Sequence, residues 1–385
     1  MYIPCGASII LLSLTLQIQI GLTSGFSTSE RASRSVASVE QLDGTGITSL
    51  LVLPPHPPAE SEENNNAVPR VLVGTKRGVL KELRIDRLDG RTGGWTARDI
   101  SDASGVALNP YPIYSMLELG GRVLAGGGDR HVTVWNETSP GLWSVSQRLG
   151  PHTGWVKDLA AVTTPGGDAM LCSIGCNCVE VWSNEEGIYE HVTKLQVDSS
   201  VEAGCTLSSD LLCLEACTTN ERSYLLAGGV DGRIHCWSLE GRKFRKQWAV
   251  PCHDGRVNDL VLVEEMNLLM TVGNDGFVKC HEMESNLRPV PGVASSLHMD
   301  SRISCISVIR EVEGVRGVVV GTASGSAVRF NIARDSCGGL VISNMNSEVV
   351  QVREPLSKQV TVHTLSPFDG AVFVGHSNGL SLWSI

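Results

Sequence analysis

The chain has 385 residues, of which 42% are hydrophobic and 19% charged, so it can build an extended core and lacks the composition of a disordered chain. Its formal net charge is −10, whereas nucleic-acid-binding proteins usually carry excess positive charge. We therefore expect no nucleic-acid partner. The length exceeds the usual size of one domain, unless the chain forms a ring of repeats in which each repeat packs on its neighbours.

The first 25 residues form a signal-like hydrophobic segment. Residues 7–20 (ASIILLSLTLQIQI) have the length of a signal-peptide core, and they are short and polar-interrupted for a membrane-spanning helix. Residues 26–33 are rich in Ser and Arg, as transit peptides are, and they begin with Phe26. Together the two segments resemble the bipartite presequences of algae with complex plastids, in which an aromatic residue follows the cleavage site.

The presequence resemblance implies import into a plastid through the secretory route. Plain secretion and a cytoplasmic location are the alternatives. The segment could also be an uncleaved anchor or a hydrophobic N-terminus without a targeting role. If it is removed by processing, we expect no stable membrane span.

The rest of the chain repeats one pattern at intervals of roughly 50 residues, which is the period of a β-propeller blade. In each repeat a stretch of small or turn-forming residues leads into an alternating strand that ends on a ring side chain. These strands end at Trp135, Trp182, Trp237, His281, Phe330 and Trp383.

In chain order the predicted strands group into seven blades. The first blade reads ITSLLVL, RVLVGT, GVLKELRI and WTARDI, and we expect a disordered loop within it at residues 54–66. Five four-stranded blades follow, with first strands that read IYSMLEL, WVKDLAAV, LLCLEA, VNDLVLV and ISCISVI. The last blade has only three strands, VTVHTLS, AVFVG and LSLW.

The missing strand of the last blade is expected from the beginning of the propeller sequence. Residues 34–42 (RSVASVEQL) alternate and precede the first blade, and an incomplete blade would leave an unpaired strand edge. We therefore predict an all-β fold, a single seven-bladed propeller over residues 34–385. Its blades are four-stranded and antiparallel, and the N-terminal strand closes the ring.

The repeats resemble those of the WD40 family, in which Gly-His precedes the inner strand and Trp-Asp ends the third strand. Here PHTG (151–154) and CHDG (252–255) keep the histidine, four strands keep the Trp, and Asn or Ser replaces the Asp. The resemblance covers nearly all of residues 34–385. It implies a propeller that serves as a binding platform, with His, Ser or Thr, Asp and Trp forming a hydrogen-bonded set inside a blade.

The fifth blade offers such a set in His253, Thr271 and Asp275, with His281 at the Trp position. An Asp, a His and a hydroxyl are also the parts of a catalytic triad. We favour a structural role, because a buried polar chain of this kind ties a loop to its strand. Residues at related positions, with the same expected role, are His152, Asp129 and Asp231.

Cys172, Cys176 and Cys178 form a C-x3-C-x-C cluster, a pattern that can contribute to a zinc site. A fourth ligand is not evident, and most cysteines alternate with apolar residues in predicted strands, as small buried hydrophobes do. The sequence has no phosphate-binding loop and no nucleophile elbow. We expect reduced cysteines, no metal, no cofactor and no enzymatic activity.

The best candidates for binding a partner stand just before the inner strands and in the turns between the second and third strands. In WD40-like rings these segments gather on one face around the channel. Trp155, Arg256 and Arg302 offer the contact area and forked hydrogen bonding of interface residues. The further candidates on this face are Arg130, Gln359 and His376.

The sequence therefore predicts a non-enzymatic scaffold or adaptor, a monomeric propeller within a complex, that binds a protein or peptide. A basic and aromatic face would suit an acidic partner. The alternative is a propeller enzyme or ligand-binding protein with its site at the channel mouth. That alternative requires titratable groups that converge from several blades.

Overall fold

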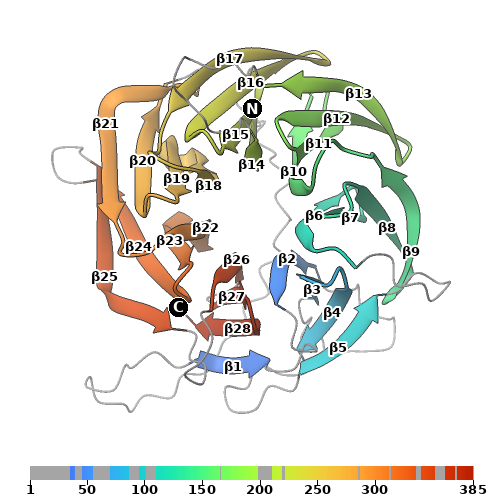
Figure 1. The fold of residues 1–385 in the computed structure, drawn as a ribbon, viewed down its shortest axis with the longest axis horizontal. Helices are drawn as coiled ribbons and strands as arrows, with labels where there is room; N and C mark the ends of the chain where they lie inside the picture. The colour runs from blue at the N-terminus through green and yellow to red at the C-terminus, as the bar shows by residue number, and fades with distance from the viewer. Residues whose placement is uncertain are drawn as a thin grey trace, which may run out of the picture.

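Seven antiparallel sheets stand around a central channel in this computed structural model, like the blades of a propeller (Figure 1). Each sheet has four strands, and six of the seven are built from strands consecutive in the chain, as hairpin connections produce. The predicted all-β, seven-bladed propeller is confirmed.

The structure describes residues 35–39, 46–54, 70–85, 95–100, 110–164, 166–197, 210–218, 222–284, 287–311, 314–334, 340–351, 360–368 and 371–384. The predicted presequence segments, residues 1–25 and 26–33, lie outside these ranges, and so does the loop expected at residues 54–66 apart from Pro54. Among the described residues no helix has the length and apolar character needed to cross a membrane.

Each blade places its first strand at the channel, and successive strands lie farther out (Figure 1). The inner strands are β2 (Ile47–Leu53), β6 (Ile113–Leu119), β10 (Val156–Thr163), β14 (Leu211–Thr218), β18 (Val257–Val263), β22 (Ile303–Glu311) and β26 (Val362–Phe368). The second strands are β3 (Arg70–Thr75), β7 (Arg122–Gly127), β11 (Ala169–Gly175), β15 (Ser223–Gly229), β19 (Leu268–Gly273), β23 (Gly314–Thr322) and β27 (Ala371–His376).

The third and fourth strands form the outer half of each blade. The third strands are β4 (Leu80–Ile85), β8 (Val132–Ser139), β12 (Cys178–Glu185), β16 (Arg233–Glu240), β20 (Phe277–Met283), β24 (Ser326–Arg334) and β28 (Gly379–Ser384). The outermost strands are β5 (Trp95–Ile100), β9 (Leu142–Leu149), β13 (Ile188–Gln196), β17 (Lys243–Pro251), β21 (Pro289–His298), β25 (Leu340–Gln351) and β1 (Ser35–Val39). One short 3-10 turn, η1 (Glu264–Met266), connects β18 to β19.

The ring is closed by β1, which comes from the N-terminal side of the first blade. It pairs antiparallel with β28, with Ala37 opposite Leu382 and Val39 opposite Leu380, and gives the sheet order β1-β28-β27-β26. In Figure 1 it lies along the outer side of the last blade. The strand falls within the predicted residues 34–42, so closure by an N-terminal strand is confirmed.

The hydrophobic core lies between the blades. Each of the seven interfaces between neighbouring blades contains one cluster of buried apolar side chains. Because each blade buries its faces only against its two neighbours, the stability of the ring is close to a sum of such interfaces. The repeated strand-end residues that belong to these clusters are Trp135, Trp182, Trp237 and Phe330.

The cysteines behave as the strand pattern predicts. The described cysteines are all free thiols, and most of them pack among apolar side chains. The six cysteines that were expected in strands are all buried: Cys172, Cys178, Cys213, Cys236, Cys280 and Cys305.

A belt of polar contacts also links neighbouring blades where the inner strands begin. The second residue of β2, β18 and β22 donates to the carbonyl of the first residue of the next inner strand, at 2.6, 2.6 and 2.5 Å. In the second blade Ser115 donates to a carboxylate oxygen of Asp158 on β10, at 2.8 Å. The donors to backbone carbonyls are Thr48, Asn258 and Ser304.

Proline in the closing strand should open the ring at one edge. Neighbouring amides of a strand point to opposite sides, so Ala37→Pro/Ser38→Pro removes one amide that faces β28. We expect the melting temperature in differential scanning calorimetry to fall by about 4 °C or more. Ala37→Thr/Ser38→Thr keeps both amides and should melt close to wild type, and equal melting of the two variants would argue against closure by β1.

Candidate functional site at the channel mouth

One face of the ring, the mouth face, is formed by the loops before the inner strands and the turns between second and third strands. In six blades an amide at the start of that turn donates to the carbonyl of the residue just before the inner strand, at 2.8–3.0 Å. This repeated bond places the loop and the turn of each blade together. The accepting residues are Gly46, Pro112, Asp210, Arg256, Arg302 and Thr361.

An aromatic and cationic group lies on the mouth face at blades two and three. Trp155, just before β10, is 54% exposed, and its ring stacks on Tyr114 of β6 at 5.8 Å between centroids and 25° between planes. The Lys157 Nζ atom lies 3.6 Å from the centroid of the Tyr114 ring and 4.7 Å from that of Trp155. These cation–π contacts hold an ammonium group against both rings.

Arg256, just before β18, adds a second positive charge to this group. Burial, and secondarily the charge of Arg256, lowers the pKa of Lys157 to about 8. The two cations come from the third and fifth blades. Tyr114, Trp155, Lys157 and Arg256 form the mouth cluster.

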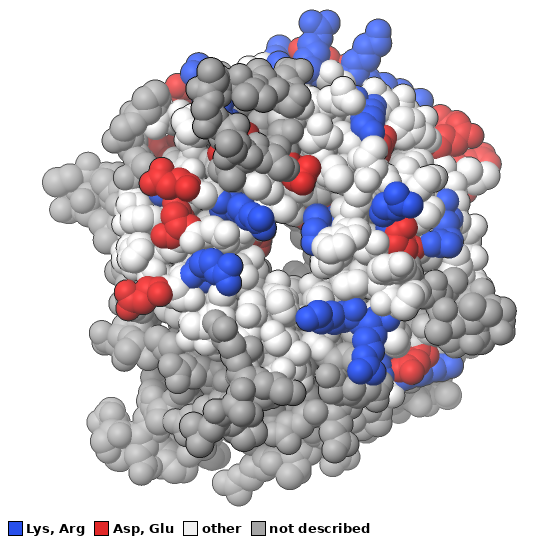
Figure 2. All heavy atoms as spheres, viewed as in Figure 1, with Lys and Arg blue, Asp and Glu red and all other residues white. Residues whose placement is uncertain are grey.

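The arginines of the mouth face differ from those at the other end of the blades. Arg130, Arg256 and Arg302 are exposed, and none of them forms an ion pair with a residue that the structure describes. At the other end arginines pair with acids of neighbouring blades: Arg242 with Asp168 and Glu185, Arg310 with Glu265, and Arg334 with Glu282. Figure 2 shows Lys and Arg side chains around the central opening.

One of the predicted surface candidates needs correction, and another stays a prediction. His376 is only 5% exposed, because it ends β27 and its Nε2 atom lies 3.1 Å from the Ser381 hydroxyl on β28, so it offers no side chain to a partner. Gln359 lies outside the described residues. The residue just before β26 is Thr361, since that strand begins at Val362, two residues later than the sequence pattern suggested.

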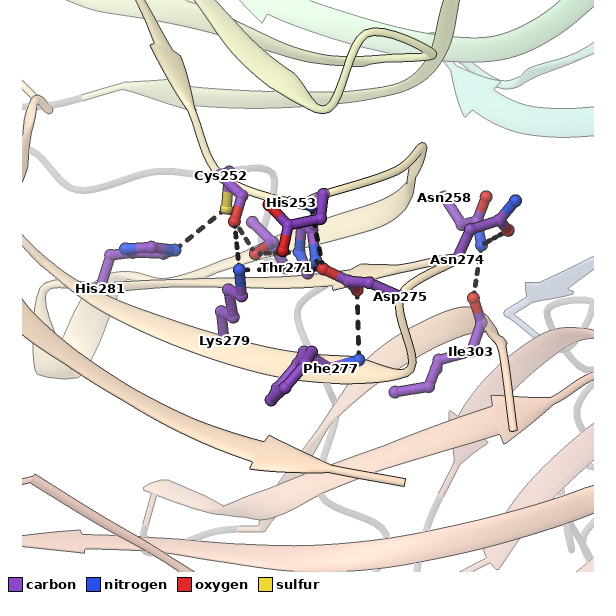
Figure 3. Close-up of polar contacts among 11 residues, drawn as sticks. Cys252, His253, Asn258, Thr271, Asn274, Asp275, Phe277, Lys279, His281 and Ile303 are labelled. Carbon is purple, nitrogen blue, oxygen red and sulfur yellow. Dashed lines mark hydrogen bonds and ion pairs between the residues drawn. The ribbon is translucent and has the colours of Figure 1, made fainter. Parts of the chain in front are cut away.

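The fifth blade brings His253, Thr271 and Asp275 together (Figure 3). The His253 Nδ1 atom lies 2.8 Å from Asp275 Oδ1, and its Nε2 atom lies 2.9 Å from the Thr271 hydroxyl. The Asp275 carboxylate also accepts the amides of Asp254 and Phe277, both at 3.2 Å. Because Thr271 is fully buried, this set leaves no path for a substrate to its hydroxyl.

His281 does not reach the Thr271 hydroxyl directly, and Cys252 bridges the two. The Cys252 Sγ atom lies 3.2 Å from His281 Nε2 and 3.1 Å from Thr271 Oγ1 (Figure 3). Burial lowers the pKa of His281 to about 4 and raises the pKa of Cys252 to about 11. Both groups are therefore neutral near pH 7, unlike the thiolate–imidazolium pair of a cysteine nucleophile.

In the third blade the set consists of His152, Ser173 and Trp182. The His152 Nε2 atom lies 2.7 Å from the Ser173 hydroxyl, and Trp182 Nε1 donates to the same oxygen at 2.9 Å. His152 Nδ1 lies 3.1 Å from the carbonyl of Arg130 in the second blade. Sequence reasoning missed Ser173, although its place on the second strand matches that of Thr271.

Asp129 and Asp231 stabilise turns. Each accepts the backbone amide two residues ahead, His131 at 3.2 Å and Arg233 at 3.1 Å, as Asp275 does with Phe277. Such Asx-type bonds favour the tight turn between the second and third strands. Their side chains also pair with Arg148 and with His235, respectively.

Three half-buried carboxylates, from successive blades, were not anticipated from the sequence. Asp158, Glu215 and Asp259 accept backbone amides of the next inner strand, β14, β18 and β22, at 2.8, 3.3 and 2.9 Å. Burial raises their pKa values to about 6, 8 and 7, respectively. The tetrapeptides VKDL (156–159) and VNDL (257–260), at equivalent places in two repeats, were the available signal.

No protein-family model matches the chain, and no curated protein has significant sequence similarity to it.

Removing the Asp275 carboxylate should destabilise the fifth blade. Asp275→Ala leaves the buried His253 Nδ1 and two amides without their acceptor, which we expect to lower the free energy of unfolding by about 1–3 kcal/mol. The neighbouring exposed residue gives a control, because Asp254→Ala should change it by less than about 0.5 kcal/mol. Urea titration followed by far-UV circular dichroism compares them, and similar losses in both variants would exclude the proposed role of Asp275.

The raised pKa values predict a stability that declines with rising pH. In the unfolded chain these carboxyls ionise near pH 4, whereas Glu215 in the fold ionises at about 8, so the free energy of unfolding should fall between about pH 4 and pH 8. Glu215→Gln keeps an oxygen for the β18 amide and should flatten this decline. Urea titrations at several pH values measure it, and an unchanged slope in the variant would contradict the assignment.

Proposed function

We propose that the protein is a non-enzymatic scaffold that binds a protein or peptide partner on its mouth face. The propeller fold commonly serves as an interaction scaffold, and the resemblance of the repeats to the WD40 family supports the same role. The observation that carries the proposal is the mouth cluster, in which an exposed Trp155 lies beside Lys157, and neither Lys157 nor Arg256 has an acidic partner among the described residues.

The mouth cluster has the composition of an interaction hot spot. Trp, Tyr and Arg carry most of the binding energy at protein interfaces, because they combine large contact area with directional hydrogen bonds. Tyr111, 52% exposed in the loop before β6, adds a further aromatic side chain to the same part of the mouth face. Single exposed apolar residues are ordinary, so the argument rests on their grouping with the cations.

A propeller enzyme is the second candidate, and one observation favours it. Asp158, Glu215 and Asp259 converge from three successive blades, which is the arrangement that an active site at the channel would need. However, each carboxylate already accepts an amide of the next blade. We therefore assign them to the cohesion of the ring and place the function on the exposed mouth face.

The proposal predicts a partner that is lost when the mouth cluster is disrupted. Trp155→Ala/Arg256→Ala should reduce partner recovery at least about tenfold, since each removed side chain can contribute more than 1 kcal/mol. Affinity purification of the tagged full chain from native cells, with quantitative mass spectrometry, measures this loss.

Ile188→Ala/Arg242→Ala is the matched control, because it removes an exposed apolar side chain and an exposed arginine at the other end of the blades. It should retain the partner. An identical set of partners for wild type and the mouth variant would reject the mouth face as the binding site.

A further inference from the structure

The mouth cluster contains two positive charges and no acidic side chain. Lys157 and Arg256 come from the third and fifth blades, and the charge of Arg256 disfavours protonation of Lys157. Neither side chain forms an ion pair within the described structure. Asp158, next to Lys157 in sequence, forms no ion pair with it, and its two oxygens accept Ser115 and the amides of Leu159 and Leu214.

The ammonium group is also fixed in place. It lies on the Tyr114 ring at 3.6 Å and beside the Trp155 ring at 4.7 Å, so Lys157 has lost much of the freedom of an ordinary surface lysine. A cation that is partly desolvated and already ordered binds an anion more strongly than a mobile, hydrated one. The geometry thus prepares a position for one negative group.

An apolar surface adjoins this position. Trp155 stacks on Tyr114 and still leaves about half of its surface exposed, and Tyr111 is exposed in the loop before the same inner strand, β6. The indole is therefore a platform for an aromatic or aliphatic side chain. A ligand that carries only charge would leave this platform open to solvent.

We propose that the mouth cluster binds a peptide segment in which an acidic side chain adjoins an aromatic one, with the carboxylate between Lys157 and Arg256 and the ring on Trp155. This inference rests on the proposed function and specifies the partner chemistry for the same face. An extended nucleic acid is disfavoured as the occupant, because the chain carries a net charge of −10.

Synthetic acidic polymers test this chemistry without a known partner. The probes are poly-L-glutamate, a random L-glutamate/L-tyrosine copolymer and single-stranded poly(dT), each immobilised and measured against the full chain by biolayer interferometry at low salt. We expect the copolymer to bind about tenfold more tightly than poly-L-glutamate, because tyrosine can stack on Trp155. Poly(dT) should bind weakest.

Variants assign the binding to the cluster. Lys157→Gln/Arg256→Gln should weaken binding of both acidic polymers at least about tenfold. Trp155→Ala should abolish the advantage of the copolymer. Arg242→Gln/Lys243→Gln, which removes two cations at the other end of the fourth blade, should leave both affinities unchanged.

Rising pH provides a further readout, in which wild type is compared with Lys157→Arg. Only its protonated form attracts the carboxylate, and burial together with Arg256 lowers its pKa to about 8, so affinity should fall between about pH 7 and pH 9. The groups that face it are Tyr114, Trp155 and Arg256, and burial raises the pKa of Tyr114 from 10.0, which keeps that phenol neutral over this range. Lys157→Arg should show a smaller fall than wild type, because a guanidinium remains charged. The fall that remains reports the carboxyls of Glu215 and Asp259, whose pKa values burial raises to about 8 and 7.

Three results would overturn the inference: no binding of the copolymer, equal binding of the copolymer and poly-L-glutamate, or tightest binding of poly(dT). The proposed function would still stand after any of these results if recovery of a cellular partner depends on Trp155 and Arg256. Conversely, if the copolymer still binds the Lys157→Gln/Arg256→Gln variant, the site that binds acidic side chains lies outside the mouth cluster.

Discussion

The fold depends on the attachment of each inner strand to the next one around the channel. Apolar clusters supply the bulk of the contact between blades, and polar side chains near the strand starts bond to the neighbouring backbone. Hydrogen bonds are directional, so these contacts set the register of one blade against the next. Hydrogen bonds from backbone amides to the carboxylates of Asp158, Glu215 and Asp259 link four successive blades in the same way.

This attachment determines what the mouth face can present. Side chains such as those of Asn258 and Asp259 form hydrogen bonds to the next blade and hold the ring together. The same strands hold the residues next to them in sequence at the opening. Lys157 stands beside Asp158 in this way, and Trp155 and Arg256 precede strands whose starts are fixed. The side chains that do not repeat from blade to blade therefore form the part of the ring available for recognition, with little freedom to lose on binding.

Much of the architecture could be predicted from the sequence, because a repeated pattern averages out local error. The closing strand followed from an alternating segment before the first blade and a three-stranded last blade, and β1 lies where that reasoning put it. The site was less accessible. A shift of two residues in the start of β26 moved the mouth position from Gln359 to Thr361, and His376 proved to be buried against Ser381. The contact of Lys157 with Tyr114 joins different blades, so no local pattern could reveal it.

The central claim is that a partner lies on Trp155 in the assembled ring. Photo-crosslinking in native cells tests it most directly, with a benzophenone amino acid placed at position 155 in one variant and at the exposed position 188 in another. We expect one dominant crosslinked protein from position 155 and none in common with position 188. The crosslinked peptide should carry an acidic side chain near the attachment point. Absence of a specific crosslink at position 155, together with a specific one at position 188, would contradict it.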